Sequence, residues 1–216
     1  MTQIELRGVA HGALRAAAGS FACTCTVITG DDARALATVV AVMSGAVRPE
    51  RGVVLLDGVP LDTTPGARRR VASLLGSENL PFARDVDAAV ARALRARGDV
   101  QRSHDVLARF GLDVWSRRAP NDLDRDELRS VALALALSHE QAEVLVLYEP
   151  LATSVSAAMS LEMAARRTLE RGAVVVIATA SRAGALRWGG PHCAVSDGVL
   201  APVAHDSVAR SDGAAP

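Results

Sequence analysis

The sequence predicts an α/β domain in which a parallel sheet is flanked by helices. Two short runs, Val144–Leu147 and Val174–Ala178, are wholly apolar and lack the polar–apolar alternation of a half-exposed strand. Such runs are typical of parallel strands that are covered on both faces. The order of segments agrees with this class, because a β-rich start is followed by a strand, a loop and a helix, then by a helical insert and by helices that alternate with the two apolar strands.

The composition excludes several classes of function. The chain has 216 residues, half of them apolar, and a formal net charge of zero, so nothing favours nucleic acid as a partner. The three cysteines, Cys23, Cys25 and Cys193, have no zinc-site spacing, and we predict free thiols and no metal. No apolar run reaches the roughly 18 residues of a membrane helix, and the N-terminus lacks a signal-peptide core. We therefore expect a cytoplasmic protein.

The first half of the chain predicts strands, turns and one long helix. Strands are expected at Ile4–Val9, Phe21–Thr29 and Val53–Leu56. The segment Ala33–Ser44 has apolar residues at helical spacing, and Asp31 and Asp32 stand where a helix N-cap belongs. A short helix is expected at Thr64–Arg70, followed by an apolar run over Val71–Leu75.

The second half predicts mainly helices. They are expected at Asp85–Arg97, Arg102–Phe110, Asp122–Ser138 and Val155–Glu170. We expect residues 1–204 to form a single domain with an antiparallel β subdomain at its N-terminus and a small helical lobe over about 78–122. The polar segment 205–216 is expected to be a flexible tail.

The segment Val27–Ala46, VITGDDARALATVVAVMSGA, resembles one part of a known family. In the nucleotide-binding subunits of ABC transporters this part is a strand, a phosphate loop G-x-x-G-x-G-K-S-T and a helix that ends in glycine. When Gly30 is aligned with the first loop glycine, Ala33 and Ala35 occupy the other two glycine positions. The lysine, the magnesium-binding serine and the threonine of the family then correspond to Leu36, Ala37 and Thr38.

The resemblance implies a phosphate site whose chemistry this chain lacks. In such a loop, backbone N–H groups surround the phosphates, the lysine neutralises them and the hydroxyl holds Mg²⁺. Leu36 and Ala37 supply neither charge nor ligand, and the whole chain contains no lysine. Arg34 is the remaining cation near the loop, but the adjacent acids repel phosphate. ATP and Mg²⁺ are thus implied by the resemblance alone, and we predict no tightly bound cofactor.

The resemblance extends to a second motif in Leu123–Ser138, LDRDELRSVALALALS. It resembles the family's signature, L-S-G-G-x-x-x-R, and the helix that follows it, and only the helix body matches position for position. Asp124, Arg125 and Asp126 replace Ser-Gly-Gly. In the family these residues face the γ-phosphate on the opposite subunit, where two aspartates would repel it. As an alternative, the aspartates cap an ordinary helix, and we favour this interpretation.

Two strand ends complete the resemblance, which runs from about Ile4 to Leu200. In Val144–Leu151, VLVLYEPL, Tyr148 replaces the metal-linked aspartate, whereas Glu149 stands at the position of the general base. In Ala173–Ser181 the switch histidine is replaced by Ala180. The structural segments Arg48–Leu61 and Ala194–Leu200 match the family, but no glutamine stands near Ser77 or Glu78, and the aspartate expected near Val155 is missing.

The resemblance implies a P-loop NTPase-like fold of the ABC ATPase type. Because the scaffold positions match and the chemical ones do not, we predict a pseudo-ATPase, with Glu149 as a vestige of the general base. Its implied partners are a transmembrane permease, an intact ATPase subunit, or both, in a homodimer or a heterodimer on the inner face of the membrane. Two alternatives remain open: a working ATPase subunit, and a non-nucleotide binder whose cleft is lined by His11, Leu36 and Tyr148.

Overall fold

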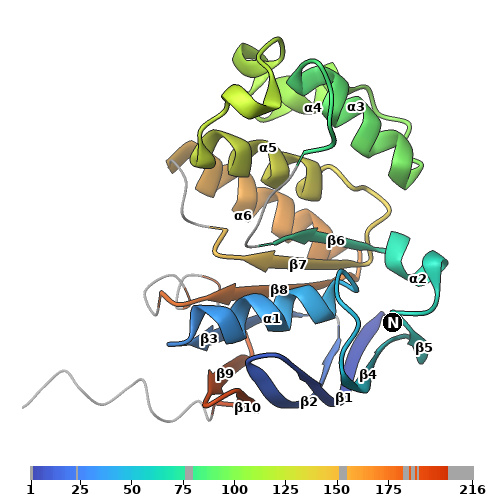
Figure 1. Ribbon diagram of the computed structural model, residues 1–216, viewed down its shortest axis with the longest axis vertical. Helices are drawn as coiled ribbons and strands as arrows, with labels where there is room; N and C mark the ends of the chain where they lie inside the picture. The colour runs from blue at the N-terminus through green and yellow to red at the C-terminus, as the bar shows by residue number, and fades with distance from the viewer. Residues whose placement is uncertain are drawn as a thin grey trace, which may run out of the picture.

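The computed structural model describes residues 2–22, 24–75, 80–150, 155–181, 185, 188 and 190–203, with the backbone alone for 155–161. The predicted fold class is confirmed: helices flank a large curled sheet (Figure 1). The predicted tail and the position of the family's glutamine near Ser77 or Glu78 lie outside these residues. No helix within the described residues is long and apolar enough to cross a membrane.

The described strands form one sheet in the order β5-β4-β1-β2-β10-β9-β3-β8-β7-β6. One part of it is antiparallel and comprises β1 (Gln3–His11), β2 (Leu14–Ala22), β4 (Arg51–Leu56) and β5 (Val59–Pro60). The other part is parallel and comprises β3 (Cys25–Gly30), β8 (Val174–Thr179), β7 (Val144–Tyr148) and β6 (Val71–Leu74). The hairpin of β9 (His192–Ser196) and β10 (Val199–Pro202) joins them.

The helices divide between the two faces of the parallel strands and a separate lobe (Figure 1). They are α1 (Ala33–Met43), α2 (Pro65–Arg69), α3 (Val86–Arg97), α4 (Ser103–Arg109), α5 (Arg125–Leu137) and α6 (Val155–Glu170). Helix α1 lies on one face, α5 and α6 lie on the other, and α3 and α4 extend beyond α5. Two 3₁₀ turns, Asp113–Trp115 and Pro120–Asp122, connect α4 to α5.

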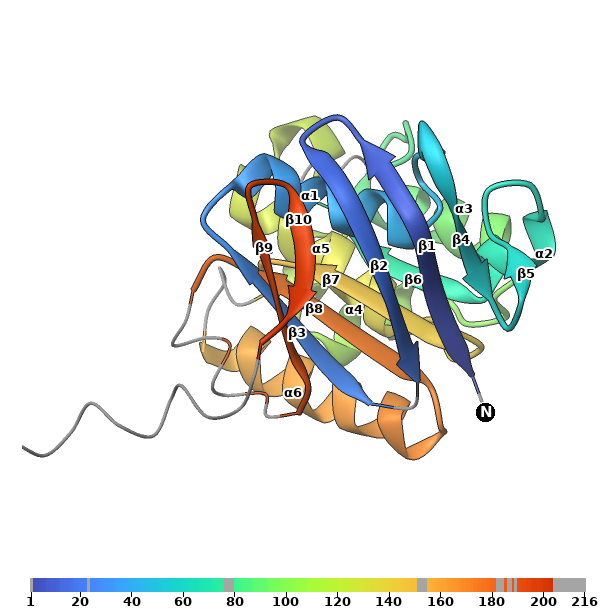
Figure 2. The ribbon, with the colours of Figure 1, turned by 90° about the horizontal axis from the view of Figure 1, so that it is seen from below.

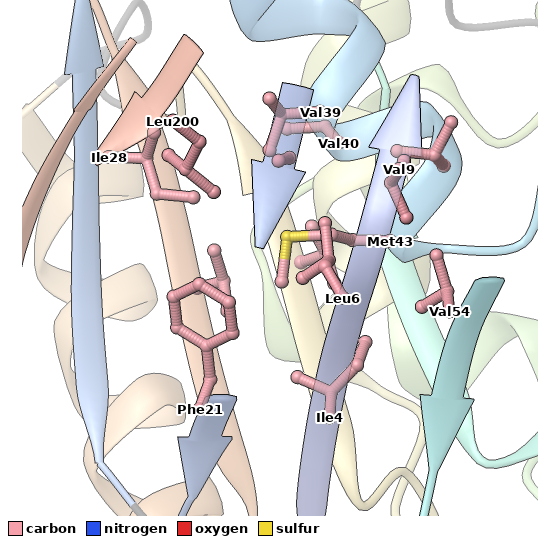
Figure 3. Packing of buried hydrophobic residues seen from close by; sticks show 14 of the residues in the cluster. Ile4, Leu6, Val9, Phe21, Ile28, Val39, Val40, Met43, Val54 and Leu200 are labelled. Carbon is pink, nitrogen blue, oxygen red and sulfur yellow. The ribbon is translucent and has the colours of Figure 1, made fainter. Parts of the chain in front are cut away.

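Three apolar clusters match this division. The largest joins α1 to the antiparallel strands, and its members include Ile4, Leu6, Val40 and Met43 (Figure 3). A second lies between β7, β8 and the helices α5 and α6, and a third lies inside the helical lobe. Because α1 is embedded in the first cluster, the loop before it is held at a fixed place above the ends of the strands.

Three elements differ from the sequence-based expectation. The strand expected at Phe21–Thr29 is divided, because Phe21 and Ala22 belong to β2 and β3 begins only at Cys25. Strand β2 was not predicted, because its sequence LRAAAGSFA is rich in alanine and glycine, which have low β propensity. It forms because β1 pairs with it from Gln3 to His11. Helix α5 begins at Arg125 rather than at Asp122, since Asp124 caps it and Pro120–Asp122 forms a separate turn.

An ion-pair network joins the antiparallel part to the parallel part. Both oxygens of the Glu143 carboxylate accept hydrogen bonds from Arg70, at 2.6 Å from Nε and 2.5 Å from Nη2. The same guanidinium also donates to Asp57, at the end of β4. These hydrogen bonds hold the pKa of Glu143 below its usual value of 4.5.

We expect Glu143→Gln to lower the free energy of unfolding by about 1 kcal/mol at pH 7, because the network is partly exposed. The contribution of Glu143 is present above its unfolded pKa and is lost as pH falls through the lower folded pKa. The difference in stability between the two proteins should therefore shrink as pH falls below 4.5, as measured by urea titration at each pH. The matched control is Glu5→Gln, which removes the exposed pair with Arg7 and should leave stability unchanged. A pH-independent difference would contradict this account.

Candidate functional site

The candidate site lies where β3 ends and α1 begins (Figure 1). Gly30, the first predicted loop glycine, is the last residue of β3. A Cβ atom there would lie 2.7 Å from the carbonyl oxygen of Val195 on β9 and 3.5 Å from Leu36. Glycine is needed at this position because β9 and α1 crowd it.

The first turn of α1 is capped by a carboxylate of the chain itself. Oδ1 of Asp32 accepts hydrogen bonds from the backbone N–H groups of Arg34, at 2.8 Å, and of Ala35, at 3.3 Å. Free N–H groups at a helix N-terminus are what a phosphate binds. Asp32 thus already occupies the anion position of this helix, and the predicted cap is confirmed.

The side chains at the predicted phosphate-loop positions supply few groups that could bind a phosphate. Ala35 and Leu36 are fully buried, and Leu36 belongs to the core cluster under α1. The hydroxyl of Thr38 donates to the carbonyl oxygen of Arg34 at 2.7 Å, one turn back on the helix. Arg34 is exposed, and Ala37 is half-buried and has no polar group. The loop therefore presents one exposed cation next to the Asp32 carboxylate.

Glu149 follows β7 and is held by the neighbouring strand. Its backbone has a φ of 42°, a left-handed conformation that is uncommon for residues other than glycine. The carboxylate accepts a hydrogen bond from the hydroxyl of Thr179 at 2.9 Å, and a second from the backbone N–H of Ala180. Ala180 stands where the family has its switch histidine. A hydrogen bond between Glu149 and Thr179 thus joins the ends of β7 and β8.

The turn after β7 is connected to two helices, to α1 through Tyr148 and to α5 through Arg129. The hydroxyl of Tyr148 points to the first turn of α1 and donates to the carbonyl oxygen of Ala33 at 3.4 Å. Burial raises the pKa of this hydroxyl, and the Glu149 carboxylate raises it further. From α5, the buried Arg129 donates to the carbonyl oxygens of Tyr148 and Glu149. Our sequence reasoning missed Arg129, although an arginine in a largely apolar helix is itself a signal of a buried partner.

The start of α5, where Asp124, Arg125 and Asp126 replace the Ser-Gly-Gly of the family's signature, is a complete capping box. Oδ1 of Asp124 accepts from the N–H groups of Asp126, at 2.9 Å, and Glu127, at 2.8 Å, while Glu127 accepts from the N–H of Asp124. Glu127 is also paired with Arg118 at 2.7 Å. The interpretation as an ordinary helix cap is confirmed for Asp124, and this helix N-terminus, too, is occupied by a carboxylate.

An open depression of about 560 Å³ lies beside the α1 N-terminus. Its described lining carries three acids, Asp31, Asp32 and Asp197, and one cation, Arg15. The predicted cleft residues His11, Leu36 and Tyr148 are not part of it, and Leu36 cannot be, since it is buried in the core. Among the residues that the structure describes, no group of three or more metal-ligating side chains could hold an ion.

We expect Asp32→Ala to lower the free energy of unfolding by about 1 kcal/mol, because it leaves the first N–H groups of α1 without an acceptor. Asp32→Asn is the matched control, since asparagine caps as well as aspartate and removes only the charge. Urea titration of both variants distinguishes them. Equal losses in the two would show that the charge, and not the cap, stabilises α1.

Comparisons with known proteins give relatives of this chain in sequence and in fold. No family model matches the chain. A thiamine import ATP-binding protein, ThiQ of Mesorhizobium japonicum, is 32% identical over 162 residues, which are 71% of this chain and 63% of that protein. ThiQ of Escherichia coli is 30% identical over 128 residues, or 57% of this chain and 55% of that protein. The chain thus spans about half of the length of the Escherichia coli relative.

The solved structures show the fold. The structure of an ATP-binding subunit of an ABC transporter superposes with a TM-score of 0.81 at 18% identity. The match covers 94% of this chain and 90% of that subunit. A dimeric bacterial ABC transporter cassette superposes with a TM-score of 0.76 at 19% identity, and the match covers 91% of this chain and 96% of that cassette. The chain therefore has the fold of the ABC transporter ATP-binding cassettes. In sequence, the two relatives named above are thiamine import ATP-binding proteins.

Proposed function

We propose that the chain is a degenerate ATP-binding cassette that serves an ABC transporter complex as a structural or regulatory subunit and does not hydrolyse ATP. The relatives named above are import ATP-binding proteins, which supports the assignment to a transporter. The proposed partners are a transmembrane permease, an intact ATPase subunit, or both. Through such a permease the chain would be peripheral on the inner face of the cell membrane.

The observation that carries the proposal is the Asp32 carboxylate on the first N–H groups of α1. A phosphate at that position would have to displace a covalently attached anion and would then lie against its charge. No lysine compensates, because Leu36 is buried in the core at the lysine position. A charge-assisted hydrogen bond is worth about 1.5–3 kcal/mol, so the loss of several such contacts lowers affinity by orders of magnitude.

Glu149 does not restore activity in this proposal. A general base acts on a nucleophile that the site positions. Here its carboxylate accepts hydrogen bonds from Thr179 and Ala180, and Tyr148 replaces the residue that would be linked to the metal. We propose that Glu149 now stabilises the turn after β7 by joining it to the end of β8.

ATP turnover tests the catalytic half of the proposal. Phosphate release by the purified chain with millimolar Mg-ATP should equal that of the buffer, and Glu149→Gln should leave it unchanged. Turnover that exceeds the buffer rate and falls with Glu149→Gln would contradict the proposal, because it would assign a working base. Glu162→Gln on α6 is the matched control for an unspecific effect of losing a carboxylate.

Assembly tests the other half. We expect the tagged chain, expressed in its own cell, to copurify with a membrane permease or with a second ATP-binding subunit that has an intact phosphate loop. Light scattering on the purified complex should give a mass above the 22.5 kDa of the single chain. A stable lone monomer from cells, with neither partner attached, would contradict a role as a subunit.

A further inference from the structure

The sheet opens between β2 and β10. These parallel strands pair only where Ala16 and Ala17 face Val199 and Leu200. Beyond that point β2 continues along β1 as far as Ala22, whereas β10 continues along β9. Figure 2 shows the two strands diverging with β3 behind the opening. The described parts of both strands therefore have an edge that faces the opening without a neighbouring strand.

The opening contains a groove of about 760 Å³. This volume lies within the range of about 300–1,000 Å³ that is typical of small-molecule sites. Its walls are formed by short or apolar residues of β2 and β10, among them Ala18, Gly19, Ala201 and Pro202. No Asp, Glu or Arg occurs in the described lining, although these residue types make up 22% of the chain.

Thr26, in the lining of this groove, carries a hydroxyl without a hydrogen-bond partner. The residue is 1% exposed, and its Oγ1 atom makes no hydrogen bond to the described residues. Buried polar groups are nearly always paired, and leaving one unpaired costs about 1–3 kcal/mol. A valine would fill the same space without this penalty. The hydroxyl is therefore a polar group that a bound molecule would satisfy.

Besides the hydroxyls of Ser20 and Thr24, the lining contains two further polar residues, His192 and Cys193, and these give it neither a mobile imidazole nor an ionised thiol. Nε2 of His192 lies 2.8 Å from the hydroxyl of Thr29, and this hydrogen bond fixes the ring. Burial raises the pKa of the Cys193 thiol, so that it stays protonated at neutral pH. Such a groove disfavours charged ligands, because nothing in it would replace their hydration.

We propose that this groove binds an uncharged, largely apolar small molecule that makes one hydrogen bond to Thr26. The site is separate from the degenerate nucleotide position. Thr26 lies near the start of β3 and Gly30 at its end, four residues or about 13 Å apart along the strand. The proposal does not depend on the proposed function, since it uses none of the residues at the α1 N-terminus.

The test is a fluorescence titration of the whole chain with N-phenyl-1-naphthylamine, which is uncharged, apolar and carries one N–H group. We expect saturable binding with a dissociation constant of about 10 µM. Ala18→Trp, which fills the groove from β2, should weaken binding more than tenfold. Ala96→Trp, on the exposed face of α3, is the matched control and should bind as the wild type does.

Thr26→Val separates a ligand-binding role from a structural one. We expect it to weaken binding roughly threefold to tenfold, through the loss of one hydrogen bond, and to raise the melting temperature by about 2 °C, because the unpaired hydroxyl is removed. Three results would each overturn the proposal: no saturable signal from the wild type, wild-type affinity in Ala18→Trp, or a lower melting temperature in Thr26→Val.

Discussion

Leu36→Lys is expected to destabilise the protein by about 4 kcal/mol and to leave Mg-ATP binding undetectable. The substitution restores the residue that the family has at this position. In this chain, however, the side chain at position 36 is fully buried among Val39, Val40 and other apolar residues of the core. An ammonium group there loses its hydration and gains no partner, so it would have to become neutral or force the helix to move.

Urea unfolding at pH 7 measures the loss, and Leu36→Met is the matched control. Methionine conserves volume, and its cost should be less than about 1.5 kcal/mol. If Leu36→Lys proved as stable as Leu36→Met and bound Mg-ATP, the loop would have kept the ability to expose this side chain. The degenerate site would then be one substitution from function, which contradicts our account of the buried helix face.

Arg129→Ala is expected to cost about 3 kcal/mol of unfolding free energy. Arg129 is 5% exposed and donates to the carbonyl oxygens of Tyr148 and Glu149, just after β7. Removing the guanidinium leaves two carbonyl groups without this donor and a void between α5 and the turn. Because Glu149 has a strained backbone, we expect this turn to lose protection from hydrogen exchange first.

The matched control is Arg125→Ala, four residues earlier on the same helix and exposed. It should change the free energy of unfolding by less than about 0.5 kcal/mol. Urea titration of the two variants is sufficient to compare them. Equal effects would show that Arg129 contributes no more than surface charge, and the turn after β7 would then need another source of support.

Much of the fold was predictable because its signals are local. The apolar runs of β7 and β8 and the helical spacing in α1 and α6 appear in short windows, and the observed elements follow them within one or two residues. Strand β2 has no such signal. Its alanine-rich sequence becomes a strand only through its pairing with β1, which a window of its own residues does not contain.

The missing phosphate-binding residues of the site were predictable from the sequence, whereas the hydrogen bonds between its side chains were less so. The absence of lysine and the leucine at position 36 can be read from the sequence directly. The Asp32 cap was predictable, because aspartate before an apolar helix has one common role. The bonding of Glu149 to Thr179 was not, since these residues are thirty positions apart and meet only because β7 and β8 are neighbours.

Mg-ATP binding to the purified chain, measured by calorimetry up to about 1 mM nucleotide, tests the central claim most directly. We predict no saturable heat, which corresponds to a dissociation constant weaker than about 1 mM and to less than about 4 kcal/mol of binding free energy. Micromolar binding would contradict the account, because it would mean that nucleotide displaces the Asp32 carboxylate from the first turn of α1.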